Sequence, residues 1–216
     1  MKSTRTPPVI VVHGLWVHGL VMEYLVHQLS KNGFQAQTWS YPSMRLTLAE
    51  NAQRLAGYCN SLAVPRLNIV AHSMGGLVVL KMLELAPAIQ CERLVLLGTP
   101  YSGSAAAQRL AQFPGGELLL GNSIRQWLNE PRPSVRAPVV GVIAGTRGLG
   151  LGLGALIGAD LPKPHDGVVA VEETVIPGVT ERITVHVGHT EMLFSSEVAR
   201  QCCAFLRHGR FDPVAS

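Results

Sequence analysis

Short apolar runs alternate with amphipathic segments along most of this chain. The runs are continuously apolar rather than alternating, which predicts strands that are covered on both faces. Between them, apolar residues recur at helical spacing. This alternation favours a three-layer α/β architecture, with a mostly parallel sheet and helices on both faces. The expected strands cover 9–12, 34–39, 67–71, 93–97, 139–144 and 183–187, and the expected helices cover 21–32, 46–62, 75–86 and 196–207.

Two segments interrupt this alternation. Residues 100–138 are partly helical and rich in Gly and Pro, and residues 147–164 are apolar and rich in Gly. Both follow an expected strand, where open α/β sheets place their ligand crevice. A length of 216 residues with 47% hydrophobic residues fits one domain over 1–216 that carries these two excursions. The composition excludes a disordered chain, and no apolar run approaches the roughly eighteen residues of a membrane span.

The charge and the cysteine content indicate which binding partners and which cellular compartment to expect. The 18 basic and 14 acidic residues give a net charge of +4, and the basic residues are scattered, so we expect no nucleic-acid partner. The cysteines show neither metal-ligand spacing nor a disulfide framework, which favours buried thiols in a reducing compartment. They are Cys59, Cys91, Cys202 and Cys203. The short apolar run at 9–12 precedes His-Gly and no cleavage site, so we expect a cytoplasmic protein.

The segment Ala-His-Ser-Met-Gly-Gly at 71–76 lies between an expected strand and an expected helix. Small residues on both sides of Ser73 permit a very tight turn in which the serine backbone is strained. A serine at this position could simply cap the helix, but the strand before it and the glycine pair after it favour a nucleophile. The segment resembles the G-x-S-x-G nucleophile elbow of the α/β-hydrolase family, with Ala71 in place of the first glycine, as in small bacterial lipases.

This resemblance implies the α/β-hydrolase fold, with Ser73 followed in the chain by an acid and then a histidine. Asp166 lies in His-Asp-Gly-Val-Val at 165–169, similar to the acid-bearing turn of bacterial lipases. An Asp-Gly pair is also a common turn, so Asp160 stays as the alternative acid. Asp212 comes too late in this order.

Three histidines follow the acid: His186, His189 and His208. His189 stands in Val-Gly-His-Thr-Glu-Met at 187–192, just past the last expected strand, where the family carries its base; a surface loop histidine is the alternative. His186 and His189 form an H-x-x-H pair without a third ligand at metal spacing, so we expect no metal site.

Acyl transfer also needs two N–H donors for the oxyanion. By the resemblance these are Met74, which follows the nucleophile, and Leu15, because Val-His-Gly-Leu-Trp at 12–16 resembles the H-G-x loop of the lipases. His13 is expected to brace this loop. The segment Gly-Thr-Pro at 98–100, followed by Ser-Gly-Ser, resembles a further turn of these lipases, with Tyr101 in place of the usual histidine.

Residues 150–155 match a G-x-G-x-x-A dinucleotide fingerprint, but they come late and precede no convincing helix. We expect an apolar loop over a substrate pocket instead, and such a loop could also touch a lipid surface. Trp16 and Tyr101 either join this lining or belong to the core. The candidate lining residues of the loop are Leu149, Leu151, Leu153, Leu156 and Ile157.

Together these features predict a serine hydrolase of the lipase and esterase type. It would cleave small-molecule or lipid carboxylic esters through an acyl-enzyme, with Ser73, His189 and Asp166 as the catalytic residues and without a metal or organic cofactor. The same residues would also serve a thioesterase, an amidase or an acyltransferase. A non-catalytic binding module on a hydrolase frame is the alternative of a different class.

Overall fold

The computed structural model describes residues 6–135, 137, 139–148 and 160–213. These residues form a six-stranded sheet in the order β2-β1-β3-β4-β5-β6, and all of its neighbouring strands pair in parallel. The strands are β1 (Val9–Val12), β2 (Ala36–Trp39), β3 (Leu67–His72), β4 (Cys91–Leu97), β5 (Val140–Gly145) and β6 (Glu181–Val185). The order reverses between β1 and β3, so the helices that follow these two strands lie on opposite faces of the sheet.

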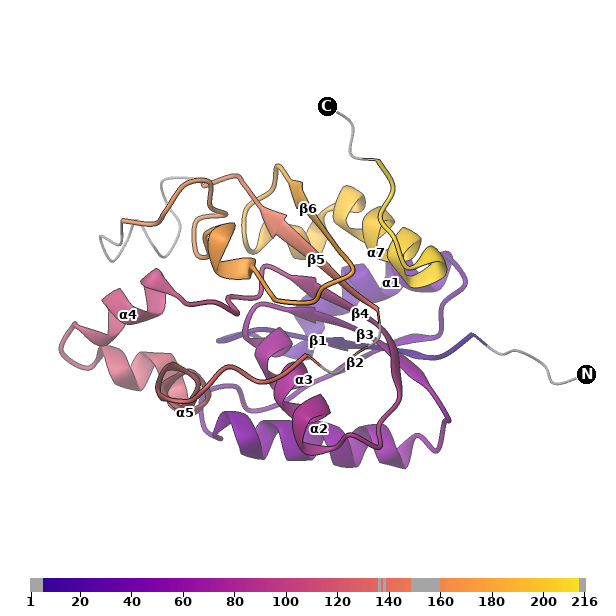
Figure 1. Cartoon of the computed structure of the whole chain (residues 1–216), viewed down its shortest axis with the longest axis horizontal. Helices are drawn as coiled ribbons and strands as arrows, with labels where there is room; N and C mark the ends of the chain where they lie inside the picture. The colour runs from indigo at the N-terminus through magenta and orange to yellow at the C-terminus, as the bar shows by residue number, and fades with distance from the viewer. Residues whose placement is uncertain (1–5, 136, 138, 149–159, 214–216) are drawn as a thin grey trace, which may run out of the picture.

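Helices cover both faces of the sheet, as Figure 1 shows. The α-helices are α1 (Glu23–Lys31), α2 (Leu48–Ser61), α3 (Met74–Leu85), α4 (Ala105–Ala111), α5 (Gly116–Asn129) and α7 (Ser196–His208). Short 3-10 turns are η1 (Gly19–Met22), η2 (Glu172–Thr174) and η3 (Glu191–Phe194). Helices α1 and α7 cover one face, and α2 and α3 cover the other. This is the three-layer α/β arrangement predicted from the sequence.

The two layers of core explain why the inner strands are apolar, whereas the edge strands β2 and β6 carry polar residues. Along β1, Val9 and Val11 face the core shared with α1 and α7, whereas Ile10 and Val12 face the core shared with α2 and α3. All four side chains are fully buried. A strand in the middle of such a sheet has no solvent side, so its sequence shows no alternation.

The boundaries differ from the expected ones in a few places. The first helix begins as the 3-10 turn η1, and β6 ends at Val185, two residues before the expected end. Beyond Val185 the Val187 N–H donates to the Val185 carbonyl and forms a local turn, while the Arg147 N–H donates to the Val187 carbonyl. Helix α2 starts at Leu48 because Thr47 and Glu50 form a reciprocal capping box.

Helices α4 and α5 come from the expected excursion after β4, and in Figure 1 they lie together at the left, beside the layered part of the molecule. Helix α5 is kinked at Gly121, whose φ is +68°. A Cβ there would lie 2.8 Å from the Met44 Cα, so the kink and the close approach both need glycine. In the described part of the chain, no helix is long and apolar enough to cross a lipid bilayer.

Candidate active site

Ser73 lies at the sharp turn between β3 and α3. Its backbone has φ +53° and ψ −127°, a conformation that a non-glycine residue adopts only under strain. The turn is held from both sides, because the Ser73 N–H donates to the Leu97 carbonyl at 2.8 Å and the Gly76 N–H donates to the Ser73 carbonyl at 3.0 Å. The Ser73 hydroxyl makes no capping bond to α3 and is directed instead to a histidine.

The two glycines after Ser73 allow neighbouring segments to touch this turn. A Cβ on Gly75 would lie 2.3 Å from the His13 carbonyl oxygen, and a Cβ on Gly76 would lie 2.1 Å from the Thr99 Oγ1. The loop after β1 and the loop after β4 therefore pack directly on the first turn of α3. Any larger residue at these positions would push them apart.

Ser73, His189 and Asp166 form a continuous chain of hydrogen bonds. The His189 Nδ1 lies 2.7 Å from the Asp166 Oδ2, and the His189 Nε2 lies 2.9 Å from the Ser73 Oγ. A carboxylate can only accept, so Nδ1 carries the proton and Nε2 accepts from the serine hydroxyl. The structure thus brings together the three residues predicted from the sequence, although they lie far apart in the chain.

Asp166 is buried, but its carboxylate is well compensated. Its Oδ1 accepts the backbone N–H groups of Val168 at 3.0 Å and Val169 at 2.7 Å, while Oδ2 faces His189. Burial alone would raise the pKa of Asp166, but His189 and these hydrogen bonds together lower it below its usual value. Asp166 is therefore an anion at neutral pH.

The residues that the sequence offers as alternatives to Asp166 and His189 do not join this hydrogen-bonded chain. Asp160 is exposed, and so are His186 and His208. The His186 Nδ1 lies 3.4 Å from the Thr146 hydroxyl, and His208 is the last residue of α7. In the described residues, no group of three His, Cys, Asp or Glu side chains is placed to hold a metal ion.

His13 braces the loop that carries Leu15. Its Nδ1–H donates to the Gly14 carbonyl at 2.8 Å, and its Nε2 accepts the Tyr41 N–H at 3.2 Å. The Tyr41 ring stacks on the His13 ring at 4.4 Å, and its hydroxyl donates to the His13 carbonyl at 3.0 Å. Burial is the main reason why the pKa of His13 is lowered, so the ring is neutral and can accept the Tyr41 N–H.

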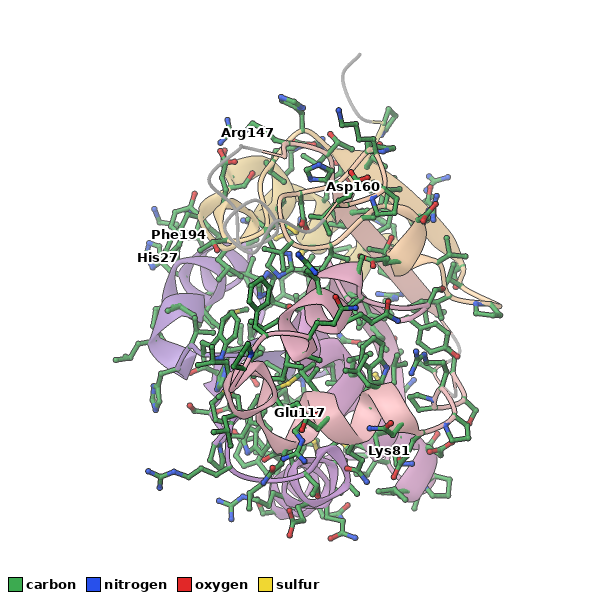
Figure 2. All side chains as sticks on the ribbon, turned by 90° about the vertical axis from the view of Figure 1, so that its left-hand side faces the viewer. His27, Lys81, Glu117, Arg147, Asp160 and Phe194 are labelled. Atoms are coloured by element: carbon green, nitrogen blue, oxygen red, sulfur yellow. The ribbon has the colours of Figure 1, made fainter. Side chains whose placement is uncertain are left out.

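A cavity of about 620 Å³ opens beside Ser73. Leu15 and Met74 line it together with the serine. Its apolar wall comes from α4 and α5, and comprises Ala106, Ala107, Leu110, Leu120 and Ile124. Its polar side includes Arg147, Thr190 and Glu191, of which Arg147 and Glu191 form an ion pair. Figure 2 views the molecule from the side of α4 and α5, with Arg147 near the top and Glu117 of α5 lower down.

Of the predicted substrate-binding residues that the structure describes, Trp16 lies at the cavity and Tyr101 does not. Trp16 lines the cavity, is 47% exposed, and donates its indole N–H to the Leu119 carbonyl of α5 at 2.7 Å. Tyr101 is instead buried in the core, where its hydroxyl donates to the Pro133 carbonyl at 3.0 Å; it is not among the residues that line this cavity. Leu151 and Leu153 lie outside the described residues, as do Leu149, Leu156 and Ile157.

Sequence reasoning missed some residues that shape this site. Gly98 has φ +54°, and a Cβ there would lie 3.1 Å from the His189 Nδ1, so the glycine makes room for the His189–Asp166 pair. Its position in the Gly-Thr-Pro turn was the available signal. The contacts of Tyr41 and His72 carry no local sequence signal, because they come from the packing of distant segments.

No protein-family profile and no curated protein sequence matches this chain. Solved structures do match it. The mature form of a Bacillus licheniformis lipase has a TM-score of 0.75 at 19% identity and covers 98% of this chain and 95% of its own. A Bacillus subtilis carboxylesterase has a TM-score of 0.60 at 15% identity, with 95% and 85% covered.

A third match is the NocB thioesterase domain, solved as a covalent complex with a fluorophosphonate nocardicin G analogue. It has a TM-score of 0.60 at 19% identity, with 94% of this chain and 95% of that chain covered. At these identities the likeness concerns the fold. The parallel sheet, its helical layers and these matches agree, and the chain has the α/β-hydrolase fold that its motifs predict.

Proposed function

We propose that this protein is a serine hydrolase that cleaves carboxylic esters with an apolar portion. The observation that carries the proposal is the hydrogen-bonded chain from Ser73 through His189 to Asp166, which begins at the cavity beside Ser73. Each member has the partner that its role requires: a hydroxyl donating to a neutral imidazole, and a buried anion accepting from the other ring nitrogen. The match to lipases and esterases in fold is consistent with this reading.

In the acylation step, the Ser73 Oγ attacks the ester carbonyl carbon while its proton passes to the His189 Nε2. The carbonyl oxygen becomes an oxyanion, for which the backbone N–H groups of Leu15 and Met74 are the donors. Met74 is the first residue of α3, so the positive end of the helix dipole faces the same charge. Asp166 stabilises the imidazolium. The carbon–oxygen bond to the leaving group then breaks, and the leaving alkoxide takes the proton from the His189 Nε2.

Deacylation repeats these steps with water. The water oxygen attacks the acyl carbon while the His189 Nε2 takes a proton from the water. When the acyl–serine bond breaks, Nε2 passes this proton to the Ser73 Oγ. The carboxylic acid is released and the enzyme is restored. The wall formed by α4 and α5 is apolar, so the hydrocarbon part of the ester would be bound there.

The decisive experiment is labelling with a fluorophosphonate, followed by peptide mapping. We expect a covalent adduct on Ser73 in the wild-type protein and none in Ser73→Ala. Ser102→Ala is the matched control, because this serine is exposed and its hydroxyl donates to the Val175 carbonyl, away from His189. Folded protein that carries no adduct on Ser73, or that is still labelled after Ser73→Ala, would contradict the proposal.

A panel of oxygen esters, matched thioesters and matched amides then defines the leaving group. We expect the oxygen esters to be cleaved with the highest kcat/KM. Faster cleavage of the thioesters at equal acyl chain length would assign the same triad to a thioesterase instead.

A further inference from the structure

His72, the residue before the proposed nucleophile, is buried beside the proposed base. It is the last residue of β3 and is 4% exposed. Its ring lies against the His189 ring, with centroids 4.6 Å apart and planes tilted by 46°. Its Nε2 lies 3.0 Å from the His189 carbonyl oxygen. None of these contacts takes part in the proposed acyl-transfer steps.

The chemistry of this contact fixes the protonation state of His72. A carbonyl oxygen can only accept, so the His72 Nε2 carries a proton and donates it. The Nδ1 of His72 is buried and has no hydrogen-bond partner among the described residues. A Cβ on Gly14 would lie 3.1 Å from this Nδ1, so the ring fills the space between the loop of Leu15 and the loop of His189. His72 is therefore a neutral imidazole with its proton on Nε2.

We propose that His72 is a positioning residue for the base: its Nε2–H holds the main chain of His189 so that the imidazole stays within reach of Ser73. This inference rests on the proposed function. The His189 N–H already donates to the Asp166 carbonyl at 2.9 Å, and the His72 bond fixes the other side of the same residue. Because His72 and Ser73 are adjacent in the chain, the nucleophile and the anchor of its base move together.

The charge of His72 matters as well as its geometry. The pKa of His72 is lowered to about 3, mainly by burial and in smaller part by the nearby His189 and His13. The His189 carbonyl and Asp166 act in the opposite direction. A cation on His72 would repel the imidazolium that forms on His189 during the reaction. A neutral donor positions the base without this repulsion.

Three substitutions separate this role from simple packing. His72→Gln places an amide N–H near the position of the histidine Nε2. In His72→Asn the side chain is one bond shorter, so its amide N–H does not reach that position. His72→Phe keeps a ring but has no donor. We expect kcat to fall about 10- to 100-fold in the Phe and Asn variants with KM changed less than about threefold, because a small misplacement of the base is costly. We expect kcat of the Gln variant to stay within about fivefold of wild type.

Active sites are counted by fluorophosphonate titration, so kcat refers to folded enzyme, and Tm is recorded for each variant. If the ring acts through packing alone, the Phe variant keeps its activity and the Gln variant loses it, which would overturn the proposal. Equal activity of all three variants would overturn it too.

A second measurement does not depend on activity. In wild-type protein with ¹⁵N-labelled histidine, we expect the His72 Nε2 to be protonated and Nδ1 to be bare from pH 7.5 down to pH 5. A proton on Nδ1, or a cationic ring in this range, would overturn the proposal. A wild-type protein that neither labels nor hydrolyses any ester would instead overturn the proposed function, and this spectroscopic result would still decide the state of His72.

Discussion

At the scale of single residues, His189 holds the proposed site together, because its ring and its main chain both make hydrogen bonds there. Its two ring nitrogens contact Asp166 and Ser73, and its main-chain N–H and carbonyl contact Asp166 and His72. The sequence predicts the ring contacts, because a serine, an acid and a histidine occur in the order of a known family. It does not predict the main-chain contacts, which depend on how two distant loops pack.

Asp166→Asn tests the direction of these hydrogen bonds. The Oδ1 position of Asp166 receives two backbone N–H donors, so the amide oxygen of asparagine would take this position and its NH₂ would face His189. The His189 Nδ1 would then have to accept, and its proton would move to Nε2. A protonated Nε2 cannot take the serine proton. We expect kcat/KM for esters to fall about 10⁴-fold, as in serine proteases with the same change.

Asp160→Asn is the matched control for this prediction, because Asp160 is the exposed alternative acid. It should keep wild-type activity, and circular dichroism should show that both variants are folded. An Asp166→Asn variant within about tenfold of wild-type kcat/KM would show that the carboxylate does not orient the base.

At the scale of elements, the sequence predicts the α/β frame well for a physical reason. The inner strands β1, β3, β4 and β5 each have an apolar run, and helices such as α2 have their own capping signal in Thr47 and Glu50. The placement of α4 and α5 is harder to predict. Helix α4 has a local cap in Ser104, but its Ala105 N–H donates to the buried Glu173 of a distant segment, and α5 bends where Gly121 meets Met44. Such contacts have no local signature, so the excursion was predicted only as partly helical.

Two glycine substitutions in helices should have opposite effects. A Cβ at Gly57 in α2 has no atom within 4 Å, so Gly57→Ala should raise the free energy of unfolding by about 0.5–1 kcal/mol through a lower backbone entropy in the unfolded chain. A Cβ at Gly75 would lie 2.3 Å from the His13 carbonyl oxygen, so Gly75→Ala should lower the free energy of unfolding by about 1–3 kcal/mol.

The two glycine variants should also differ in activity. Displacement of His13 by Gly75→Ala would move Gly14 and Leu15, so kcat should fall at least about 100-fold, the cost of one lost oxyanion donor. Gly57→Ala should leave kcat unchanged. Urea unfolding and ester hydrolysis measure both effects. Equal stability of the two variants would mean that the turn after β3 tolerates a side chain.

At the scale of the whole molecule, the sheet order determines which loops meet. Strands β1, β3 and β4 are neighbours, so the loop of Leu15, the turn of Ser73 and the Gly98 turn lie side by side, and the His189 loop after β6 reaches them. This assembly buries His13 and His72, and burial lowers the pKa of both rings. The fold therefore buries two titratable groups that an unfolded chain exposes to water, and its stability must depend on pH.

The sign of this dependence follows from proton uptake. An unfolded histidine has a pKa of about 6.5, whereas burial lowers the pKa of His72 to about 3 and also lowers that of His13. Below about pH 6.5 the unfolded state binds protons that the folded state excludes, so stability falls as pH falls. For His72 this cost approaches about 1.4 kcal/mol per pH unit below the unfolded pKa. Glu173 has the opposite trend, because burial raises its pKa.

Comparison of wild type with His72→Gln isolates one of these groups, since both proteins share His13 and Glu173. Between pH 7.5 and pH 5.0, His72 is expected to cost the wild type about 2 kcal/mol of stability, and the Gln variant should be spared this loss. Urea unfolding of both proteins at the two pH values measures the difference. If the two proteins lose the same free energy, His72 takes up its proton in the folded state, and the packing around it must open to water more easily than the close contact with Gly14 and His189 implies.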